Sequence, residues 1–584
     1  MSDIMKSIPF GQLMEWILAE HKATGQVFGI QKAYVADPDK TMEIFGRKLE
    51  NPVGPAAGPH TQLAQNLVAA YYAGARFFEL KTVQKMDGPE LSACIPKPCI
   101  VAEDEAYNCE WSTELYVPQA MGEYIKGWMA LHVISKEFGL GNPDGFQFNM
   151  SCGYNLEGIQ DKKIDDFIEG LKDAHDTDVF KECKTWLLDH INLFEHVTRE
   201  DIEAIPAEIC NSITLSTMHG CPPQEIENIV MYLLKEKHIN TYVKCNPTLL
   251  GYEFVRKAMD DLGYDYMAFT DFHFKDDLQY EDAVPMLKRL KDTAAQEGLS
   301  FGVKLTNTFP VDIKRQELPG EEMYMSGKAL FPLSITVAAR LAESFDGELP
   351  MSFSGGADQK NIEQIVGCGI WPVTVATVLL KPGGYKWMTR IAEKADECEV
   401  GACGKINVEK VKKLAESALA DAHYQKGIKK ASGKRTEERA PLLDCLKKKE
   451  TLEKKEVIAH KRVCGNCADV CPNRANVLIE VPEMEFLQIL HVDYMCNECG
   501  NCRSFCQYAG APYKDKFTLF ATEEDMKNSI NNGFTVLNAD TKEVRIRVGD
   551  KEEVVKADRP SGILTEGLTQ LICTVINDYT YLLM

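Results

Sequence analysis

Eight short apolar segments, separated by stretches with helical periodicity, constrain the fold of this chain most strongly. They lie between residues 52 and 375, and the alternation predicts a parallel sheet with crossover helices. The segments are 52–54, 77–80, 146–149, 213–215, 242–244, 301–304, 351–353 and 373–375. Eight is the strand number of a TIM (β/α)8 barrel, so the predicted fold class is α/β with such a barrel. Polar or glycine-rich residues follow nearly every segment, at the ends where barrel active sites form.

Seven cysteines near the C-terminus form two runs. Cys464, Cys467 and Cys471-Pro472 precede a run with the spacing Cys-x2-Cys-x2-Cys-x3-Cys that begins at Cys496. This is the spacing of bacterial two-cluster ferredoxins, in which the fourth cysteine of each run ligates the other cluster. We therefore predict a ferredoxin-like iron–sulfur module. A zinc site is the alternative, which the interdigitated runs disfavour.

The same rule assigns ligands to each cluster. The ligands of the first are Cys471, Cys496, Cys499 and Cys502, and those of the second are Cys464, Cys467 and Cys506. Lys461 stands where the remaining cysteine of the second cluster belongs. A distant ligand such as Cys445, a non-cysteine ligand such as His460 and a three-iron cluster are the alternatives. We favour two 4Fe–4S clusters, the second with an unidentified fourth ligand.

Composition excludes several classes of protein. The formal net charge of −22 over 584 residues argues against a nucleic-acid partner. No apolar run approaches the roughly 20 residues needed to span a bilayer, so no membrane partner is expected. The twenty cysteines, without a signal-peptide pattern, indicate thiols in a reducing cytoplasm rather than a disulfide framework. The helical spacing of Phe10–Leu18 predicts a packed helix.

Charge and periodicity divide the chain into four parts. Residues 1–403 are predicted as the barrel domain, and 404–460, rich in lysine and glutamate, as a charged connector. Residues 461–520 form the ferredoxin-like module. Residues 521–584 are predicted as a small extension with a β element and a final helix from Leu568 to Leu583.

Several motifs, in order, resemble the flavin barrels of the dihydroorotate and dihydropyrimidine dehydrogenases. They are Asn51–Gly58, Glu79–Val83, Val243–Pro247, Leu305–Thr308, Ser326–Pro332, Ser354–Asp358 and Ala376-Thr377. The resemblance implies bound FMN, and the residues that it implies for FMN binding are Ala56, Ala57, Gly58, Lys81, Thr82, Lys244, Thr308, Ser326, Gly327, Ser354, Gly355, Gly356, Ala376 and Thr377. Glycines allow backbone N–H groups to approach a phosphate closely. A lysine at the flavin ring stabilises negative charge on the reduced ring.

The segment Asn108-Cys109-Glu110 matches the Asn-x-Glu substrate loop of dihydropyrimidine dehydrogenase, which is the closest resemblance. An amide beside a carboxylate can bind a ring that carries adjacent C=O and N–H groups. The substrate-binding residues that the resemblance implies are Asn108, Glu110, Asn149, Asn307 and Thr308.

The proton donor departs from the pattern of that family. Relatives carry a cysteine after the fourth strand, where this chain has Thr217. A threonine hydroxyl is a poor acid, whereas imidazole and thiol groups have pKa values nearer neutrality. The candidates are Cys221, His219, Thr217 and Cys152, in that order, and Lys244 is the further catalytic residue that the resemblance implies.

Relatives that join such a barrel to iron–sulfur clusters usually also carry an FAD and NADPH module. No convincing G-x-G-x-x-G after a strand is found here. The architecture resembles the family of selenate reductase iron–sulfur (large) subunits, without the pyridine-nucleotide domain. Electrons are therefore expected from a ferredoxin or from a separate flavoprotein subunit that oxidises NAD(P)H, and an oligomer is expected.

The leading hypothesis is an oxidoreductase that reduces a C=C or C=N bond of a purine- or pyrimidine-type N-heterocycle. An oxidised purine such as urate is the leading substrate candidate. Electrons would pass from the clusters to FMN and then to the ring. One alternative is an electron-transfer or maturation subunit of a molybdenum- or selenium-dependent hydroxylase or reductase. Another is a dihydroorotate- or dihydropyrimidine-type dehydrogenase that runs oxidatively.

Overall fold

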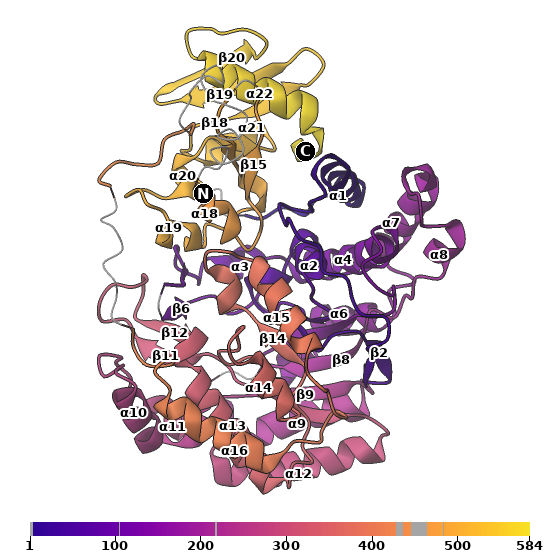
Figure 1. The fold of residues 1–584 in the computed structure, drawn as a ribbon, viewed down its shortest axis with the longest axis vertical. Helices are drawn as coiled ribbons and strands as arrows, with labels where there is room; N and C mark the ends of the chain where they lie inside the picture. Colours follow the sequence, from indigo (N-terminus) through magenta and orange to yellow (C-terminus); the bar gives the residue numbers. More distant parts are fainter. Residues whose placement is uncertain (1–3, 104, 217–218, 428–435, 445–463, 483) are drawn as a thin grey trace.

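The structure of the chain is a computed structural model that describes residues 4–103, 105–216, 219–427, 436–444, 464–482 and 484–584 (Figure 1). Within these residues, eight parallel strands form one nearly closed sheet in the order β3-β14-β13-β10-β9-β8-β7-β4. They are β3 (Val53–Pro55), β4 (Phe77–Glu79), β7 (Gln147–Cys152), β8 (Cys210–Leu215), β9 (Asn240–Cys245), β10 (Phe301–Leu305), β13 (Met351–Phe353) and β14 (Val373–Val375). Each coincides with one predicted segment, which confirms the TIM barrel.

The first and second barrel strands approach very closely where the sheet closes. The backbone N–H of Arg76 donates to the carbonyl oxygen of Val53 over 2.9 Å, which joins the edge strands β3 and β4. A Cβ at Gly54 would lie 1.7 Å from the carbonyl oxygen of Phe77, so only glycine permits this approach. Closure thus depends on a residue without a side chain.

Helices surround the barrel and bury their apolar faces against the strands. The helices of this layer are α2 (Ala64–Tyr72), α4 (Val117–Glu137), α6 (Lys162–Lys172), α7 (Asp178–Asp189), α9 (Pro223–Lys235), α10 (Tyr252–Asp261), α12 (Tyr280–Gln296), α13 (Phe331–Ser344), α14 (Ile362–Gly367) and α15 (Lys386–Asp396). Shorter ones are α3 (Gly88–Ser92), α5 (Leu156–Ile159), α8 (Arg199–Glu203) and α11 (Phe272–Asp276). No helix among the described residues is long and apolar enough to cross a membrane.

A second, antiparallel sheet lies at the carboxyl ends of the barrel strands (Figure 1). In the described chain it has four strands in the order β11-β12-β6-β5. They are β5 (Ile100–Val101), β6 (Ala106–Asn108), β11 (Phe309–Asp312) and β12 (Glu322–Ser326). We call this the cap sheet. It was not predicted from the sequence, and it carries Asn108 and Ser326 to the mouth of the barrel. A separate hairpin pairs β1 (Met42–Ile44) with β2 (Arg47–Leu49).

The predicted connector begins inside the barrel domain. Helix α16 (Val408–Ala420) packs on α13, with Val411, Leu414 and Ala418 buried at helical spacing. Tyr424 then stacks on Phe331 with ring centroids 4.7 Å apart. The boundary at 403 therefore falls before the end of the barrel domain. The basic stretch 429–435 and the segment 445–460 lie outside the described residues.

Residues 464–520, called the cysteine module below, share one sheet with the C-terminal extension. The sheet order is β15-β16-β17-β18-β19-β20, and the parallel pairing of β17 with β18 crosses the predicted boundary at 520. The strands are β15 (Asn476–Ile479), β16 (Gln488–Val492), β17 (Thr518–Phe520), β18 (Gly533–Asn538), β19 (Glu543–Val548) and β20 (Lys551–Lys556). The helices are α18 (Asn466–Asp469), α19 (Asn501–Ser504), α20 (Pro512–Asp515), α21 (Glu523–Asn528) and α22 (Glu566–Asp578).

The N-terminal helix lies beside the C-terminal end of the chain, as Figure 1 shows. The N-terminal helix α1 (Phe10–Thr24) buries Leu13 and Ile17, as its periodicity predicted. Gln12 donates through Nε2 to the carbonyl oxygens of Tyr581 and Leu583 over 2.7 and 3.0 Å. The N-terminal segment is therefore part of the packed structure.

Candidate active site

A cavity opens at the carboxyl ends of the barrel strands, under the cap sheet. All fourteen residues that the sequence predicted for cofactor binding line it, namely Ala56, Ala57, Gly58, Lys81, Thr82, Lys244, Thr308, Ser326, Gly327, Ser354, Gly355, Gly356, Ala376 and Thr377. Asn108, Glu110 and Asn307 line it as well. Asn149 does not, because its side chain is buried in β7 and donates to Thr214 Oγ1 over 2.8 Å.

Three loops meet at one end of this cavity. Ser326 Oγ and Thr377 Oγ1 lie 3.0 Å apart, which joins the loop after β12 to the loop after β14. Gly356 has a φ of +77°, and a Cβ there would lie 2.5 Å from the carbonyl oxygen of Gly327. The backbone of these loops is thus closely packed at the cavity wall, as in phosphate-binding loops.

Buried charges occupy the barrel interior beneath the cavity. Lys304 Nζ lies 2.9 Å from Glu79 Oε2, and both side chains are about 1% exposed. Burial raises the pKa of Glu79, but the charges of Lys304 and Lys244 outweigh it and the net pKa is lowered. Lys244, on the fifth barrel strand, therefore lies near a carboxylate whose ionised form is favoured.

The structure shows the surroundings of three of the four candidate proton donors. Thr217 lies outside the described residues. Cys152 is fully buried in β7, and burial raises the pKa of its thiol to about 12. Cys221 lines a different, small cavity with Asp277, and burial raises its pKa to about 11. Neither thiol lines the site cavity, and neither is a good acid near neutral pH.

His219 does not line the site cavity, but it belongs to a hydrogen-bonded network that reaches the cavity wall. Its Nδ1 lies 2.8 Å from Oδ2 of Asp277, a side chain only 1% exposed. Asp277 also accepts from Asn246 Nδ2 over 3.0 Å and from Thr248 Oγ1 over 2.7 Å. Asn307, which lines the cavity, donates through Nδ2 to Asn246 Oδ1 over 2.7 Å. The network thus connects the imidazole to the cavity wall.

The buried carboxylate of Asp277 determines which nitrogen of the His219 imidazole carries the shared proton. Burial raises the pKa of Asp277, but the hydrogen bond from His219 and the other donors outweigh it, so the net pKa is lowered. Because an ionised carboxylate only accepts, His219 Nδ1 carries the shared proton and Nε2 is left to exchange one. Asp277 was missed in the sequence, where no motif marks it, and Asn246 stands in the motif Val243–Pro247 but was given no role.

The module's cysteines fall into two groups. Cys471, Cys496, Cys499 and Cys502 line one small cavity, and Cys464, Cys467 and Cys506 line another. No disulfide occurs among the described cysteines. In the described part of the chain, no three His, Cys, Asp or Glu residues lie close enough to hold one metal ion. Each group gathers three or four thiols around one small cavity, and thiolates are the ligands of iron–sulfur clusters.

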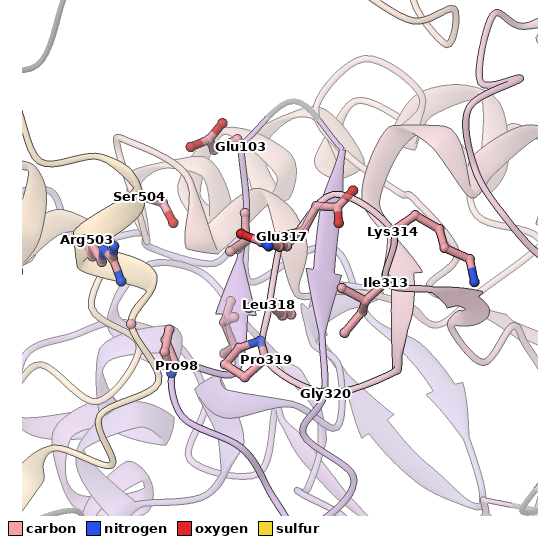
Figure 2. Close-up of a pocket in the computed structure, with 14 residues that line it drawn as sticks. Pro98, Glu103, Ile313, Lys314, Glu317, Leu318, Pro319, Gly320, Arg503 and Ser504 are labelled. Atoms are coloured by element: carbon pink, nitrogen blue, oxygen red, sulfur yellow. The ribbon is translucent and has the colours of Figure 1, made fainter.

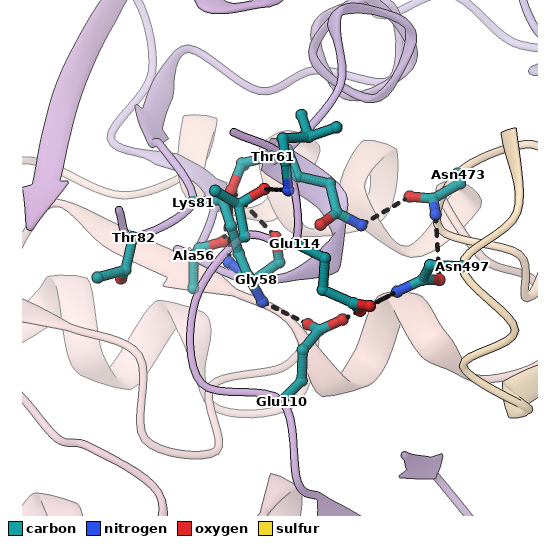
Figure 3. A network of polar contacts seen from close by, with 12 residues as sticks. Ala56, Gly58, Thr61, Lys81, Thr82, Glu110, Glu114, Asn473 and Asn497 are labelled. Atoms are coloured by element: carbon teal, nitrogen blue, oxygen red, sulfur yellow. Dashed lines mark hydrogen bonds and ion pairs between the residues drawn. The ribbon is translucent and has the colours of Figure 1, made fainter. Parts of the chain in front are cut away.

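A chain of buried polar side chains connects the cysteine module to the site cavity (Figure 3). Asn497, which follows Cys496, donates through Nδ2 to Glu110 Oε1 over 3.2 Å and to Glu114 Oε1 over 2.9 Å. Lys81 Nζ forms an ion pair with Glu110 Oε2. Both oxygens of Glu110 are therefore engaged. The sequence did not indicate this arrangement.

A second cleft, of about 660 Å³, lies between the cap sheet and the cysteine module (Figure 2). Residues 313–320 form one side, and Gly500, Arg503 and Ser504 form the other. Ile100 lines both this cleft and the site cavity. The two openings thus share a wall beside the four-cysteine group.

Comparisons with known proteins identify the barrel. Residues 28–426 match the family described as "Oxidoreductase YgfK, N-terminal TIM-barrel domain". The YgfK proteins of Escherichia coli strain K12 and of E. coli O157:H7 are each 46% identical over 459 residues. The match covers 76% of this chain and 44% of each relative, so the chain spans about half their length.

Among solved structures, DHODH of Eimeria tenella in complex with ferulenol is similar over 65% of this chain and 89% of its own, with 16% identity and a TM-score of 0.39. The matched family segment agrees with the end of the barrel domain after α16 and not with a boundary at 403. It covers most of the described residues, including the whole site cavity. The chain therefore belongs to the YgfK oxidoreductase family, whose N-terminal TIM-barrel domain it carries.

Proposed function

We propose that the chain is an FMN- and iron–sulfur-dependent oxidoreductase that reduces a C=C or C=N bond of a purine- or pyrimidine-type ring. An oxidised purine such as urate is the leading substrate candidate. One observation carries the proposal, namely the adjacency of the site cavity and the four-cysteine group. Cys499 accepts at its carbonyl oxygen from the backbone N–H groups of Cys99 and Ile100, over 3.0 and 2.9 Å, and Ile100 lines the cavity.

Several features of the site cavity suit FMN. Glycine loops and paired hydroxyls at one end suit its phosphate. Lys81 and Lys244 supply positive charge to the rest of the cavity. When bound, FMN supplies two-electron hydride chemistry. Lys244 would stabilise negative charge on the ring, and the loops after β13 and β14 would hold the phosphate.

The cysteine groups fit iron–sulfur clusters. Cys471, Cys496, Cys499 and Cys502 would hold the cluster nearer the cavity, and Cys464, Cys467 and Cys506 the other. Such clusters transfer single electrons. Cys445 and His460, the candidates for the last ligand, lie outside the described residues. A ferredoxin or a separate flavoprotein subunit that oxidises NAD(P)H would supply the electrons.

Ring recognition would rest on Asn108 and Asn307, which line the cavity. Their amides can pair with adjacent C=O and N–H groups of a ureide-type ring. Glu110 is already held by Lys81 and Asn497, so we assign it to orienting Lys81. His219 Nε2 would hold the proton that is delivered beside the reduced carbon, because Asp277 fixes the opposite nitrogen.

Anaerobic purification followed by absorption spectra and iron analysis tests the cofactors. The protein is expected to carry FMN and iron together, and chemical reduction of the iron centres should bleach the flavin. The reduced protein is then mixed with a panel of purines and pyrimidines. Flavin reoxidation by at least one oxidised purine, with a ring-reduced product, supports the proposal. A panel that leaves the flavin reduced contradicts the substrate class.

A further inference from the structure

The contact between the cysteine module and Lys81 passes through side chains that are all buried. Lys81, Glu110 and Asn497 are 3%, 9% and 1% exposed. Lys81 lies in the loop after the second barrel strand, Glu110 in a loop of the cap sheet, and Asn497 in the cysteine module. Glu110 and Asn497 are 387 residues apart in the sequence.

The nitrogen and the oxygen of the Asn497 side-chain amide are both hydrogen-bonded. Both of its N–H groups face carboxylates, those of Glu110 and Glu114. Its Oδ1 accepts from Asn473 Nδ2 over 3.3 Å, and Asn473 Oδ1 accepts from Gln62 Nε2 over 3.0 Å. Because carboxylates only accept, the orientation of the Asn497 amide is fixed (Figure 3).

We propose that Asn497 is a positioning residue for the flavin site, and that it acts through Glu110 on Lys81. Asn497 holds one oxygen of Glu110 in place, and the other oxygen holds the Lys81 ammonium at the cavity wall. The cysteine module thereby supplies a contact without which the charge at the FMN cavity is not fixed. This inference rests on the proposed FMN site.

The alternative is that Asn497 only stabilises the docking of the module. If Asn497 is a positioning residue, its substitution and that of Lys81 affect FMN binding through the same contact. If it only stabilises docking, the two substitutions act independently. Residues in one hydrogen-bonded network show non-additive effects, whereas independent residues show additive ones. Loss of the Asn497 amide leaves a buried carboxylate oxygen of Glu110 without its donor, which destabilises the arrangement.

The test is a double-mutant cycle on FMN affinity. Asn497→Ala, Lys81→Met and the double variant are made in the full chain and stripped of flavin. The Kd for FMN is then measured from the quenching of flavin fluorescence. Asn497→Ala is expected to raise the Kd about tenfold. The double variant is expected to bind no more than about twofold more weakly than Lys81→Met alone.

Asn501→Ala is the matched control. Asn501 is buried in the same module and also crosses to the barrel, donating through Nδ2 to the carbonyl oxygen of Leu380 over 2.9 Å. It does not contact Glu110, so its effect on the Kd is expected to be small and additive with Lys81→Met. Iron content and thermal unfolding are measured for every variant, which separates loss of folding from loss of positioning.

Glu110→Gln keeps the shape of the side chain and removes its charge. It is expected to weaken FMN binding and to abolish the further effect of Asn497→Ala. Multiplicative effects of Asn497→Ala and Lys81→Met, or an unchanged Kd in Asn497→Ala with iron retained, overturn this inference alone. Unaltered protein that takes up no FMN overturns both the proposed function and this inference.

Discussion

Gly355, in the loop after β13, has no room for a side chain. A Cβ at this position would lie 1.9 Å from Ser334 Oγ and 2.4 Å from Ser334 Cβ. Ser334 is fully buried, and its hydroxyl is 2.7 Å from Thr306 Oγ1, so it has no room to withdraw. The loop therefore requires glycine for packing as well as for access to its backbone.

We expect Gly355→Ala to lose most of its bound FMN and to be destabilised by about 1–3 kcal/mol, because the added methyl group overpacks the loop. Gly367→Ala is the control, since a Cβ at Gly367 meets nothing within 4 Å. Flavin per chain and denaturant unfolding are measured for both. Equal flavin content in the two variants would contradict the assignment of this loop to FMN.

His219 and Cys221 are two residues apart and both lie near Asp277, but it is His219 that is hydrogen-bonded to this carboxylate. In the proposed reaction, His219→Gln removes the exchangeable proton, and we expect reoxidation of the reduced flavin by substrate to slow by about 100-fold or more. Cys221→Ser leaves the His219–Asp277 pair intact and should change this rate little. Stopped-flow absorbance measures both rates. Slow reoxidation in Cys221→Ser with a normal rate in His219→Gln would reverse the assignment.

At the scale of elements, an ion pair joins α11 to the cap sheet. His273 Nε2 lies 2.6 Å from Glu322 Oε2 on β12. The hydrogen bond that His273 donates to Glu322 raises the pKa of His273 above 6.5, and burial opposes it only partly. The charges of Asp276 and Asp277 act in the same direction as Glu322. The folded state therefore binds the proton of His273 more tightly than the unfolded state does.

The stabilisation from this pair is fully present below pH 6.5, where the imidazole is charged in both states. It is lost as the pH rises through the raised pKa. We expect His273→Gln to lower the free energy of unfolding by about 0.5 kcal/mol near pH 6, since the pair is partly exposed, and by less near pH 9. Urea unfolding at both pH values measures this. The exposed His175→Gln is the control, and a larger loss at pH 9 would contradict the sign.

The barrel strands could be predicted because each is a short apolar run between polar turns, and a buried parallel strand needs no more than that. The cap sheet could not be. Its strand β5 has two residues and β6 has three, and β6 pairs with β12, more than 200 residues away in the sequence. Helix α16 could have been found, because its buried residues recur at helical spacing among the lysines and glutamates.

At the scale of the whole molecule, the site brings together residues from distant parts of the chain. No local sequence pattern connects these parts. The fourteen cofactor positions were predicted because each stands in a short motif at a strand end. Asp277 stands in no motif and Asn497 at an unspecified position of the run that begins at Cys496, and their roles follow from contacts across the folded chain. The sequence therefore predicts the loops of such a cavity better than it predicts the side chains that orient its charged groups.

The interface between the barrel and the cysteine module implies that the two unfold together. Arg474 in the module donates through Nε to the carbonyl oxygen of Phe28 over 2.9 Å, and Asn501 reaches Leu380. The backbone N–H groups of Cys99 and Ile100 donate to the carbonyl oxygen of Cys499. Because bound metal stabilises the folded state that holds it, iron in the module should stabilise the barrel through these contacts.

We therefore expect anaerobic removal of iron to lower the unfolding temperature of the whole chain by at least about 5 °C. Calorimetry should show one transition for the iron-loaded protein, since the shared interface couples the parts. Protein that keeps iron but has lost flavin is the control, and it should retain the single transition. If the barrel instead unfolds in its own transition, at the same temperature with and without iron, then the module docks on the barrel without stabilising it.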